Sequence, residues 1–200
     1  TNAGGVAAGA GITLGGAVAG TVANTQSLTL NAGTGGVIGA SSTIGTGTSL
    51  ATLTVTNSGG ATFTGAVTTG TSVVLTDTTD AANITFTGAL TTPTLTTAAQ
   101  AYDLDLHGGG TSITNATAFL NTGTLALGDA AADILLFSGG VTATDPSGVT
   151  LNGQLRTAGN AVSLGDAGTA VTLAGTTSII DTTNAGGVAA GAGITLGGAV

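Results

Sequence analysis

The sequence predicts an all-β fold, a right-handed parallel β-helix (β-solenoid), and three observations lead to it. Short segments that alternate apolar and polar residues occur along the whole chain, and each is followed within a few residues by Gly, Asn, Asp or Ser. These segments recur every 20 to 25 residues. Helical periodicity is lacking, and the abundant Gly and Thr are poor helix formers.

The chain also contains a long perfect repeat. Residues 183–200, TNAGGVAAGAGITLGGAV, are identical to residues 1–18, at an offset of 182 residues. We therefore expect residues 1–182 to form one long tandem-repeat unit and residues 183–200 to begin the next, within a longer array. Arrays of this kind grow along one axis, and each unit contacts only its neighbours.

The clearest expected strands, in chain order, are residues 12–14, 28–30, 53–56, 61–64, 73–76, 84–87, 104–106, 149–151, 162–164 and 171–173. A finer register comes from the last apolar residue of an apolar-Thr-apolar-x-Gly motif, with imperfect matches around Ile38 and Leu106. This residue recurs at Leu14, Ile38, Phe63, Phe86, Leu106, Leu127, Leu151, Leu173 and Leu196. Its spacings fill the 182-residue unit with about eight coils. A looser series runs between them, at Leu30, Val55, Leu75, Leu95, Ile113, Leu136, Leu164 and Ile180.

Two or three short strands per coil fit this spacing, each paired with its equivalent one coil above and below at about 4.8 Å. Crossovers between parallel strands are right-handed as a strong rule, so we expect a right-handed helix. A narrow interior suits Val, Ile, Leu and Ala, with Phe63, Phe86, Phe119 and Phe137 as larger fillers. Each end of such a stack is an open sheet edge, so we expect caps outside this stretch or contacts between subunits.

The composition excludes several classes of protein. The nine acidic residues are all Asp and face one base, Arg156, for a net charge of −8, which disfavours binding to nucleic acid or anionic lipid. With no Cys, neither disulfides nor thiolate metal sites are available. Residues 3–20 are uncharged but consist mostly of Gly and Ala, so we expect no membrane span.

Close pairs of acidic residues are the candidate binding sites. The pairs are Asp77 with Asp80, Asp103 with Asp105, and Asp129 with Asp133. Carboxylates in such pairs can bind Ca²⁺, whereas Asp also occurs at turns because its side chain hydrogen-bonds the local backbone. We favour the turn interpretation and keep Ca²⁺ as the alternative, with no other cofactor expected.

A second constellation lies in the segment YDLDLHGGG. Strand alternation places Asp103, Asp105 and His107 on one face and Leu104 with Leu106 on the other. Such a trio could serve acid–base or metal chemistry, but we favour the interpretation of a polar outer strand face. A single Arg and no Lys disfavour a polysaccharide lyase, and we expect no enzymatic activity.

The repeat style resembles that of a known family. The segments ITLGGAV (12–18), SLTLNAGTGGVIGA (27–40), TVTNSGGATFTGAVTT (54–69), FLNTGTLALGDAAADILLFSGG (119–140) and TTNAGGVAAGAGITLGGAV (182–200) are similar to the β-strand repeats of giant bacterial surface proteins, the filamentous-haemagglutinin-like adhesins and related extracellular fibre proteins. The resemblance implies secretion, a β-helical stalk, and a role in adhesion, matrix or sheath. The resemblance implies no catalytic residue.

These observations together predict a structural segment of a very long secreted bacterial β-solenoid that forms a cell-surface stalk, filament or sheath fibre. The expected partners are other copies of the chain, end to end or side by side, with contact to glycans or a cell surface as a further option. The alternative is an adhesin repeat that binds glycan or Ca²⁺ on its surface.

Overall fold

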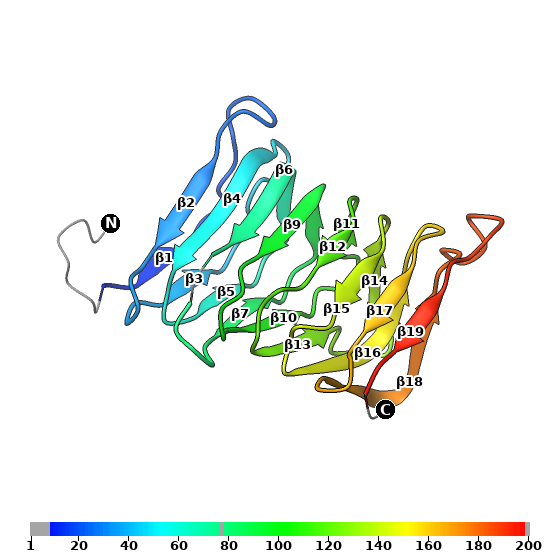
Figure 1. The fold of residues 1–200 in the computed structure, drawn as a ribbon. Coiled ribbons are helices and arrows are strands. Elements are labelled where there is room, and N and C mark those ends of the chain that lie inside the picture. Colours follow the sequence, from blue (N-terminus) through cyan, green and yellow to red (C-terminus); the bar gives the residue numbers. More distant parts are fainter. Residues whose placement is uncertain (1–8, 77, 199–200) are drawn as a thin grey trace.

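Short parallel strands stacked in coils make up the computed structural model, which describes residues 9–76 and 78–198. These residues form no helix, and their strands wind into a β-solenoid of about seven turns. The chain advances from the N-terminal end of the stack to the C-terminal end, so the colours of Figure 1 follow one another along its axis. The predicted all-β parallel solenoid is therefore confirmed.

Each coil has three faces, and the first face is the most regular. Its eight rungs are β1 (Ile12–Leu14), β3 (Ile38–Ala40), β5 (Ala61–Phe63), β7 (Asn83–Phe86), β10 (Asp103–Leu106), β13 (Thr124–Leu127) and the first halves of β16 (Gly148–Arg156) and β18 (Ala170–Asp181). Every neighbouring pair is parallel. Seven turns of the chain separate the first of these eight rungs from the last, so the number of residues per turn is close to the expected coil length.

The second face is made of shorter rungs. It begins with the isolated bridges of Val18 to Ile44 and of Ile44 to Val67. It continues through the start of β6 (Val67–Leu75), β8 (Leu90–Thr92), β11 (Ser112–Ile113), β14 (Ile134–Phe137) and the second halves of β16 and β18.

The third face divides into two ladders. The first contains β2 (Leu28–Asn31), β4 (Leu50–Asn57), the end of β6 and β9 (Thr94–Thr97). The second contains β12 (Thr117–Ala118), β15 (Val141–Ala143), β17 (Val162–Leu164) and β19 (Ile194–Leu196). Thr97 joins them, because its hydroxyl oxygen accepts a hydrogen bond from Leu120 N–H (2.8 Å) and its hydroxyl donates to Ala118 O (3.3 Å).

The core is a set of apolar columns that run along the axis. One column of the first face contains Leu14, Ala40, Phe63, Phe86, Leu106, Leu127, Leu151 and Leu173. The rings of Phe63 and Phe86 stack in it, with centroids 4.8 Å apart and planes inclined by 14°. Apolar side chains therefore pack on apolar side chains of the next coil, and a coil becomes buried only when another coil lies on each side.

Glycines form the corner between the first and second faces. A Cβ added at Gly88 would lie 2.4 Å from the carbonyl carbon of Gly65, and one at Gly108 would lie 2.2 Å from the carbonyl oxygen of Gly88. The backbones of successive coils approach so closely here that no side chain fits. Glycine is required at this corner for lack of space.

The register differs from the prediction in two places. Leu14 pairs with Ala40, and Ile38 pairs with Ile12, so the apolar-Thr-apolar motif misplaced the second rung by two residues. Leu196 pairs with Leu164 on the third face, where the spacing had placed it next to Leu173 on the first. The stretch between β18 and β19 is rich in Gly and Ala, with Val188 as its one larger apolar residue, so Ile194 and Leu196 fill the third face instead.

The looser series of the sequence combines two faces. Leu30, Val55 and Leu75 lie in register on the third face. Ile113 and Leu136 belong to strands of the second face, as does Ile180. The spacings of the series scatter because it crosses from the third face to the second.

Candidate functional site

The outer side of the first face carries the side chains that the sequence singled out. In β10, Leu104 and Leu106 are fully buried, while Asp103 and Asp105 are half-buried on the opposite side, as strand alternation predicted. His107 follows directly after the strand. The three polar residues therefore do share one face.

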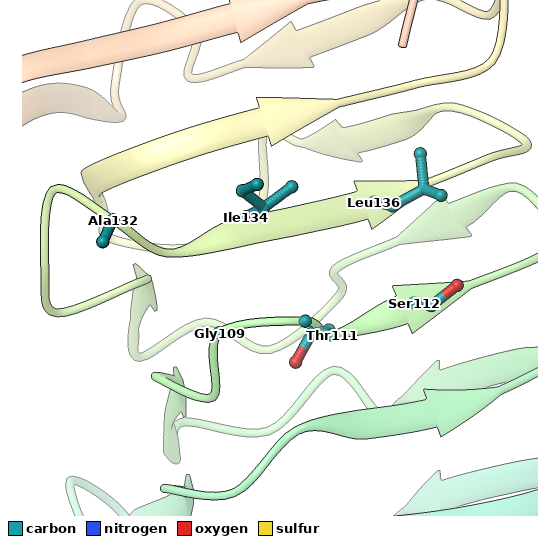
Figure 2. A pocket seen from close by; sticks show the side chains of 7 residues that line it. Gly109, Thr111, Ser112, Ala132, Ile134 and Leu136 are labelled. Atoms are coloured by element: carbon teal, nitrogen blue, oxygen red, sulfur yellow. The ribbon is translucent and has the colours of Figure 1, made fainter. Parts of the chain in front are cut away.

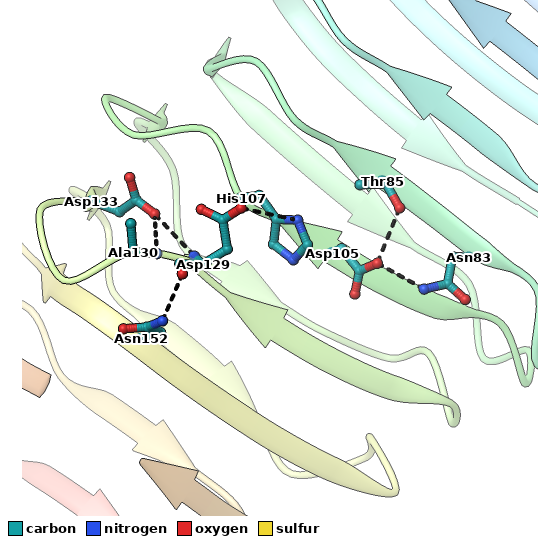
Figure 3. Close-up of polar contacts among 8 residues, drawn as sticks. All are labelled: Asn83, Thr85, Asp105, His107, Asp129, Ala130, Asp133 and Asn152. Atoms are coloured by element: carbon teal, nitrogen blue, oxygen red, sulfur yellow. Dashed lines mark hydrogen bonds and ion pairs between the residues drawn. The ribbon is translucent and has the colours of Figure 1, made fainter. Parts of the chain in front are cut away.

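Hydrogen bonds to neighbouring coils engage both of these carboxylates. Asp105 Oδ2 accepts a hydrogen bond from Asn83 Nδ2 (2.7 Å) and another from Thr85 Oγ1 (3.0 Å), both in β7 (Figure 3). Asp103 Oδ1 accepts one from the N–H of Thr124 at the start of β13 (2.6 Å). One acid thus contacts the coil before it and the other contacts the coil after it, so the pair links three successive coils.

The pair Asp129 and Asp133 forms a turn. Asp133 Oδ2 accepts the backbone N–H groups of Asp129 and Ala130, each at 2.9 Å (Figure 3). Asn152 Nδ2, one coil further along, donates to Asp129 O (2.7 Å). This is the turn-capping role of Asp, in which the side chain takes the place of a backbone acceptor.

His107 and Asp129 form the contact that comes nearest to an acid–base pair. Nδ1 of His107 lies 3.8 Å from Oδ2 of Asp129, and the His107 and Asp129 side chains are 25% and 57% exposed. A contact of this length between such accessible groups is weak, because water screens it. Asp105, on the other side of the histidine in Figure 3, is directed to Asn83 and Thr85.

The remaining calcium candidates are not brought together with these. Asp80 is exposed in the turn between β6 and β7, and Asp77 lies outside the described residues. Within residues 9–76 and 78–198, no three His or acidic side chains gather closely enough to hold a metal ion. Calcium binding accordingly stays a prediction.

A shallow hollow lies beside this region, between β11 and β14 (Figure 2). Its volume is about 320 Å³, and it is lined by Gly109, Gly110, Thr111, Ser112, Ala132, Ile134 and Leu136. Ile134 and Leu136 supply the large apolar side chains, and Thr111 and Ser112 the hydroxyl groups. No charged side chain lines the hollow, so its chemistry suits an apolar contact better than an ion.

Asp181 at the end of β18 stands apart from the acidic pairs and also forms a turn. Hydrogen bonds from the Thr183 hydroxyl and from the backbone N–H groups of Ala185 and Thr183 hold the pKa of the Asp181 carboxyl below its ordinary value of 3.8, and Arg156 adds to this effect. The signal was present in the sequence as Asp followed two residues later by Thr, a common local turn pattern.

Among the residues that the structure describes, no helix is long and apolar enough to cross a membrane.

Comparison of the chain with protein-family models, with curated proteins and with solved structures finds no match in any of the three.

Proposed function

We propose that this chain is a structural segment of a very long secreted bacterial β-solenoid, which forms a stalk, filament or sheath fibre at the cell surface. The observation that carries this proposal is the stacking of eight equivalent rungs on the first face without an interruption between Ile12 and Leu173. A fold that adds equivalent turns along one axis suits a spacer or fibre.

The mechanical argument rests on the direction of the backbone hydrogen bonds. In the first face, Ile12 N–H donates to Val37 O and Ile38 N–H donates to Gly60 O, each at 2.9 Å, so the bonds join one coil to the next. Tension along the rod therefore loads many parallel hydrogen bonds together. Because each coil is stabilised mainly by its neighbours, stability grows with the number of coils.

Composition supports an exposed fibre. Arg156 is the one Lys or Arg of the chain and lies within β16, so trypsin-like proteases have a single point of attack. The net charge of −8 keeps neighbouring rods apart in solution. The bacterial and extracellular parts of the proposal rest on the resemblance of the repeats to surface fibre proteins.

The length of chains that contain several repeat units tests the fibre role. Chains with one, two and three consecutive 182-residue units are imaged by electron microscopy. Eight coils per unit at about 4.8 Å each add about 38 Å of rod per unit, and the width stays constant. Separate globules on a string, or a width that grows with unit number, would contradict the proposal.

Location needs its own test. Antibodies raised against the folded chain are applied to intact and to permeabilised cells of the source. Labelling of intact cells, abolished by mild surface proteolysis, is the expected result. Labelling that requires permeabilised cells would contradict the cell-surface role and leave the rod-like shape untouched.

A further inference from the structure

The second face carries an apolar hollow next to the one Lys or Arg of the chain. Ile134 and Leu136 of β14 are half-buried on the outward side of this face and line the hollow together with Ser112 of the preceding coil (Figure 2). In the following coil, Ile134 pairs with Gln154 and Leu136 pairs with Arg156. The hollow and the positive charge are therefore neighbours on the flank of the rod.

Arg156 has hydrogen-bond donors to spare. Its Nη2 donates to Gln154 Oε1 (2.5 Å), and its Nε is buried without a partner. Among the described residues, no carboxylate lies within ion-pair distance of its guanidinium. Asp181 in the next coil accepts hydrogen bonds from Thr183 and Ala185 instead. Because a guanidinium binds a carboxylate through two parallel hydrogen bonds, Arg156 is suited to an acid from outside the chain.

The corner between the third and first faces carries the complementary features. Leu120, in the turn between β12 and β13, is 40% exposed, and among the described residues it is the one exposed large apolar side chain outside the first and last coils. One coil later the same corner carries the exposed Asp145, whose carboxylate accepts one long hydrogen bond, from the Thr144 hydroxyl (3.5 Å). An apolar projection and a nearly free acid thus follow each other along this corner.

The path of the chain places these features at matching heights. In a coil with three faces, the corner between the third and first faces lies opposite the second face. Leu120 comes after Ser112 and before Leu136 along a chain that advances along the axis, so it lies between their coils, as the hollow does (Figure 1). Asp145 lies in the same way between Leu136 and Arg156. Two rods side by side, in one orientation and at one height, would bring Leu120 to the hollow and Asp145 to Arg156.

We propose that a second copy of this chain docks side by side in this arrangement, with its Leu120 in the hollow and its Asp145 paired with Arg156. A corner of one rod contacts a face of the next, so the contact does not close, and further rods extend it into a layer. This inference rests on the proposed fibre role and names the lateral contact through which such fibres form a sheath.

Charge and size determine the strength of this contact. The net charge of −8 opposes contact between two copies, but here the one Arg of each copy meets an acid of its neighbour. A contact strip along eight coils, about 38 Å long and about 10 Å wide, covers roughly 400 Å², against about 800 Å² per partner in a stable interface. Single chains are therefore expected to associate weakly, whereas rods of several repeat units add their contacts in step.

Reversing the charge on each side of the contact gives the decisive test. In Arg156→Asp and in Asp145→Arg alone, like charges meet. Sedimentation velocity at physiological salt and high protein concentration is expected to show wild-type oligomers that grow with concentration, and monomers of either variant. An equimolar mixture of the two variants is expected to recover the wild-type sedimentation, because each corner then meets a face of opposite charge on the other variant.

Matched variants separate this contact from general effects of charge and of folding. Asp80→Arg, at the same corner of an earlier coil, changes the net charge as Asp145→Arg does and is expected to assemble at least as well as the wild type. Leu120→Ser is expected to lose assembly, whereas Val22→Ser, at a side chain 59% exposed in the first coil, is expected to keep it. Circular dichroism checks the β structure of each variant, and recovery in the mixture shows directly that both charge variants are folded.

Three results would overturn the inference: a wild-type chain that stays monomeric, assembly of Arg156→Asp equal to that of the wild type, or a mixture of the two charge variants that stays monomeric. None of them affects the fibre role, which fails instead if added repeat units do not lengthen the rod by about 38 Å each. Rods that lie side by side in images each keep the width of a single rod, so the two tests remain distinct.

Discussion

β16 and β18 are equivalent strands one coil apart, and they differ in what covers them. Both extend from the first face into the second, and they pair in two stretches separated by an irregularity, where residues 174–177 of β18 lie opposite Asn152 alone. The residues of β16 alternate strictly between buried and half-buried, whereas most residues of β18 are exposed. The matched positions Leu151 and Leu173 are leucines of the same column, yet Leu151 is fully buried and Leu173 is 50% exposed, so burial at this position depends on place in the stack.

The largest effect is expected from truncating the same column position in the two strands. Leu151→Ala removes a fully buried side chain with a coil on either side, and about 2–5 kcal/mol of unfolding free energy is expected to be lost. Leu173→Ala removes a half-exposed side chain from the open end, for a cost of about 1 kcal/mol. Urea unfolding of both variants measures the difference. Equal losses would mean that the last coil is covered as fully as the coil before it.

A glycine pair extends the comparison to the backbone. Gly88→Ala places a methyl group against the Gly65 backbone at the crowded corner, and overpacking of this kind costs about 1–3 kcal/mol. Gly39→Ala is the matched control, because its Cβ meets no atom within 4 Å and points outward from β3. We expect the control to be neutral or slightly stabilising. A neutral Gly88→Ala in the same denaturant titration would show that the coils stack more loosely.

The aspartate side chains that cap turns within the stack are expected to contribute less to the free energy of unfolding than the buried leucines and the corner glycines. Asp133→Ala leaves the N–H groups of Asp129 and Ala130 without their acceptor, at a cost of about 1 kcal/mol. Asp133→Asn keeps one side-chain oxygen as an acceptor and is expected to lose less. The melting temperature measures both. If Asn and Ala were equally destabilising, the negative charge and not the hydrogen bonding would be the important feature.

In the last coil, lowering the pH is expected to reduce stability through Asp181, the last residue of β18. Its pKa is lowered in the folded chain, so its stabilising contribution is present above the unfolded pKa and is lost as the pH falls through the lowered folded value. The stability difference between the wild type and Asp181→Asn should therefore shrink as the pH falls from about 5 to about 2. A difference that stayed constant over this range would argue against the hydrogen-bonded turn.

Calcium is expected to have the smallest effect. Asp105 and Asp133 each accept two hydrogen bonds on one carboxylate oxygen, and Asp103 accepts one. These carboxylates therefore already have hydrogen-bond donors of the protein as partners. The melting temperature should be the same in calcium chloride and in chelator. A calcium-dependent rise that Asp129→Asn abolishes would instead support the alternative of a calcium-binding repeat.

Much of the fold followed from the sequence, because a repeated stack gives the same information many times. The spacing of Phe63, Phe86, Leu106, Leu127, Leu151 and Leu173 matches six consecutive rungs of the first face. The motif failed at β3, where Ala40 replaces the large apolar residue and Gly39 replaces Thr. Rungs as short as β11, two residues long, leave no alternating pattern to detect.

The candidate site was less accessible to sequence reasoning. Strand alternation placed Asp103 and Asp105 correctly, but the partners of Asp105 lie about a coil earlier in the chain, at Asn83 and Thr85. The corner glycines likewise contact glycines of the preceding coil. Such contacts depend on which residues stack, and the turn lengths that decide this vary from coil to coil.

Distances between spin labels test the central claim, in-register stacking along one axis, most directly. Since the chain has no Cys, labels attach where cysteines are introduced on the outward column of the first face. Paired with Thr13→Cys, labels at Ala126, Thr150 and Thr172 lie five, six and seven rungs away. The account predicts backbone separations of about 24, 29 and 34 Å, a constant step per coil. Separations that do not rise from one pair to the next, as in two antiparallel sheets packed face to face, would contradict it.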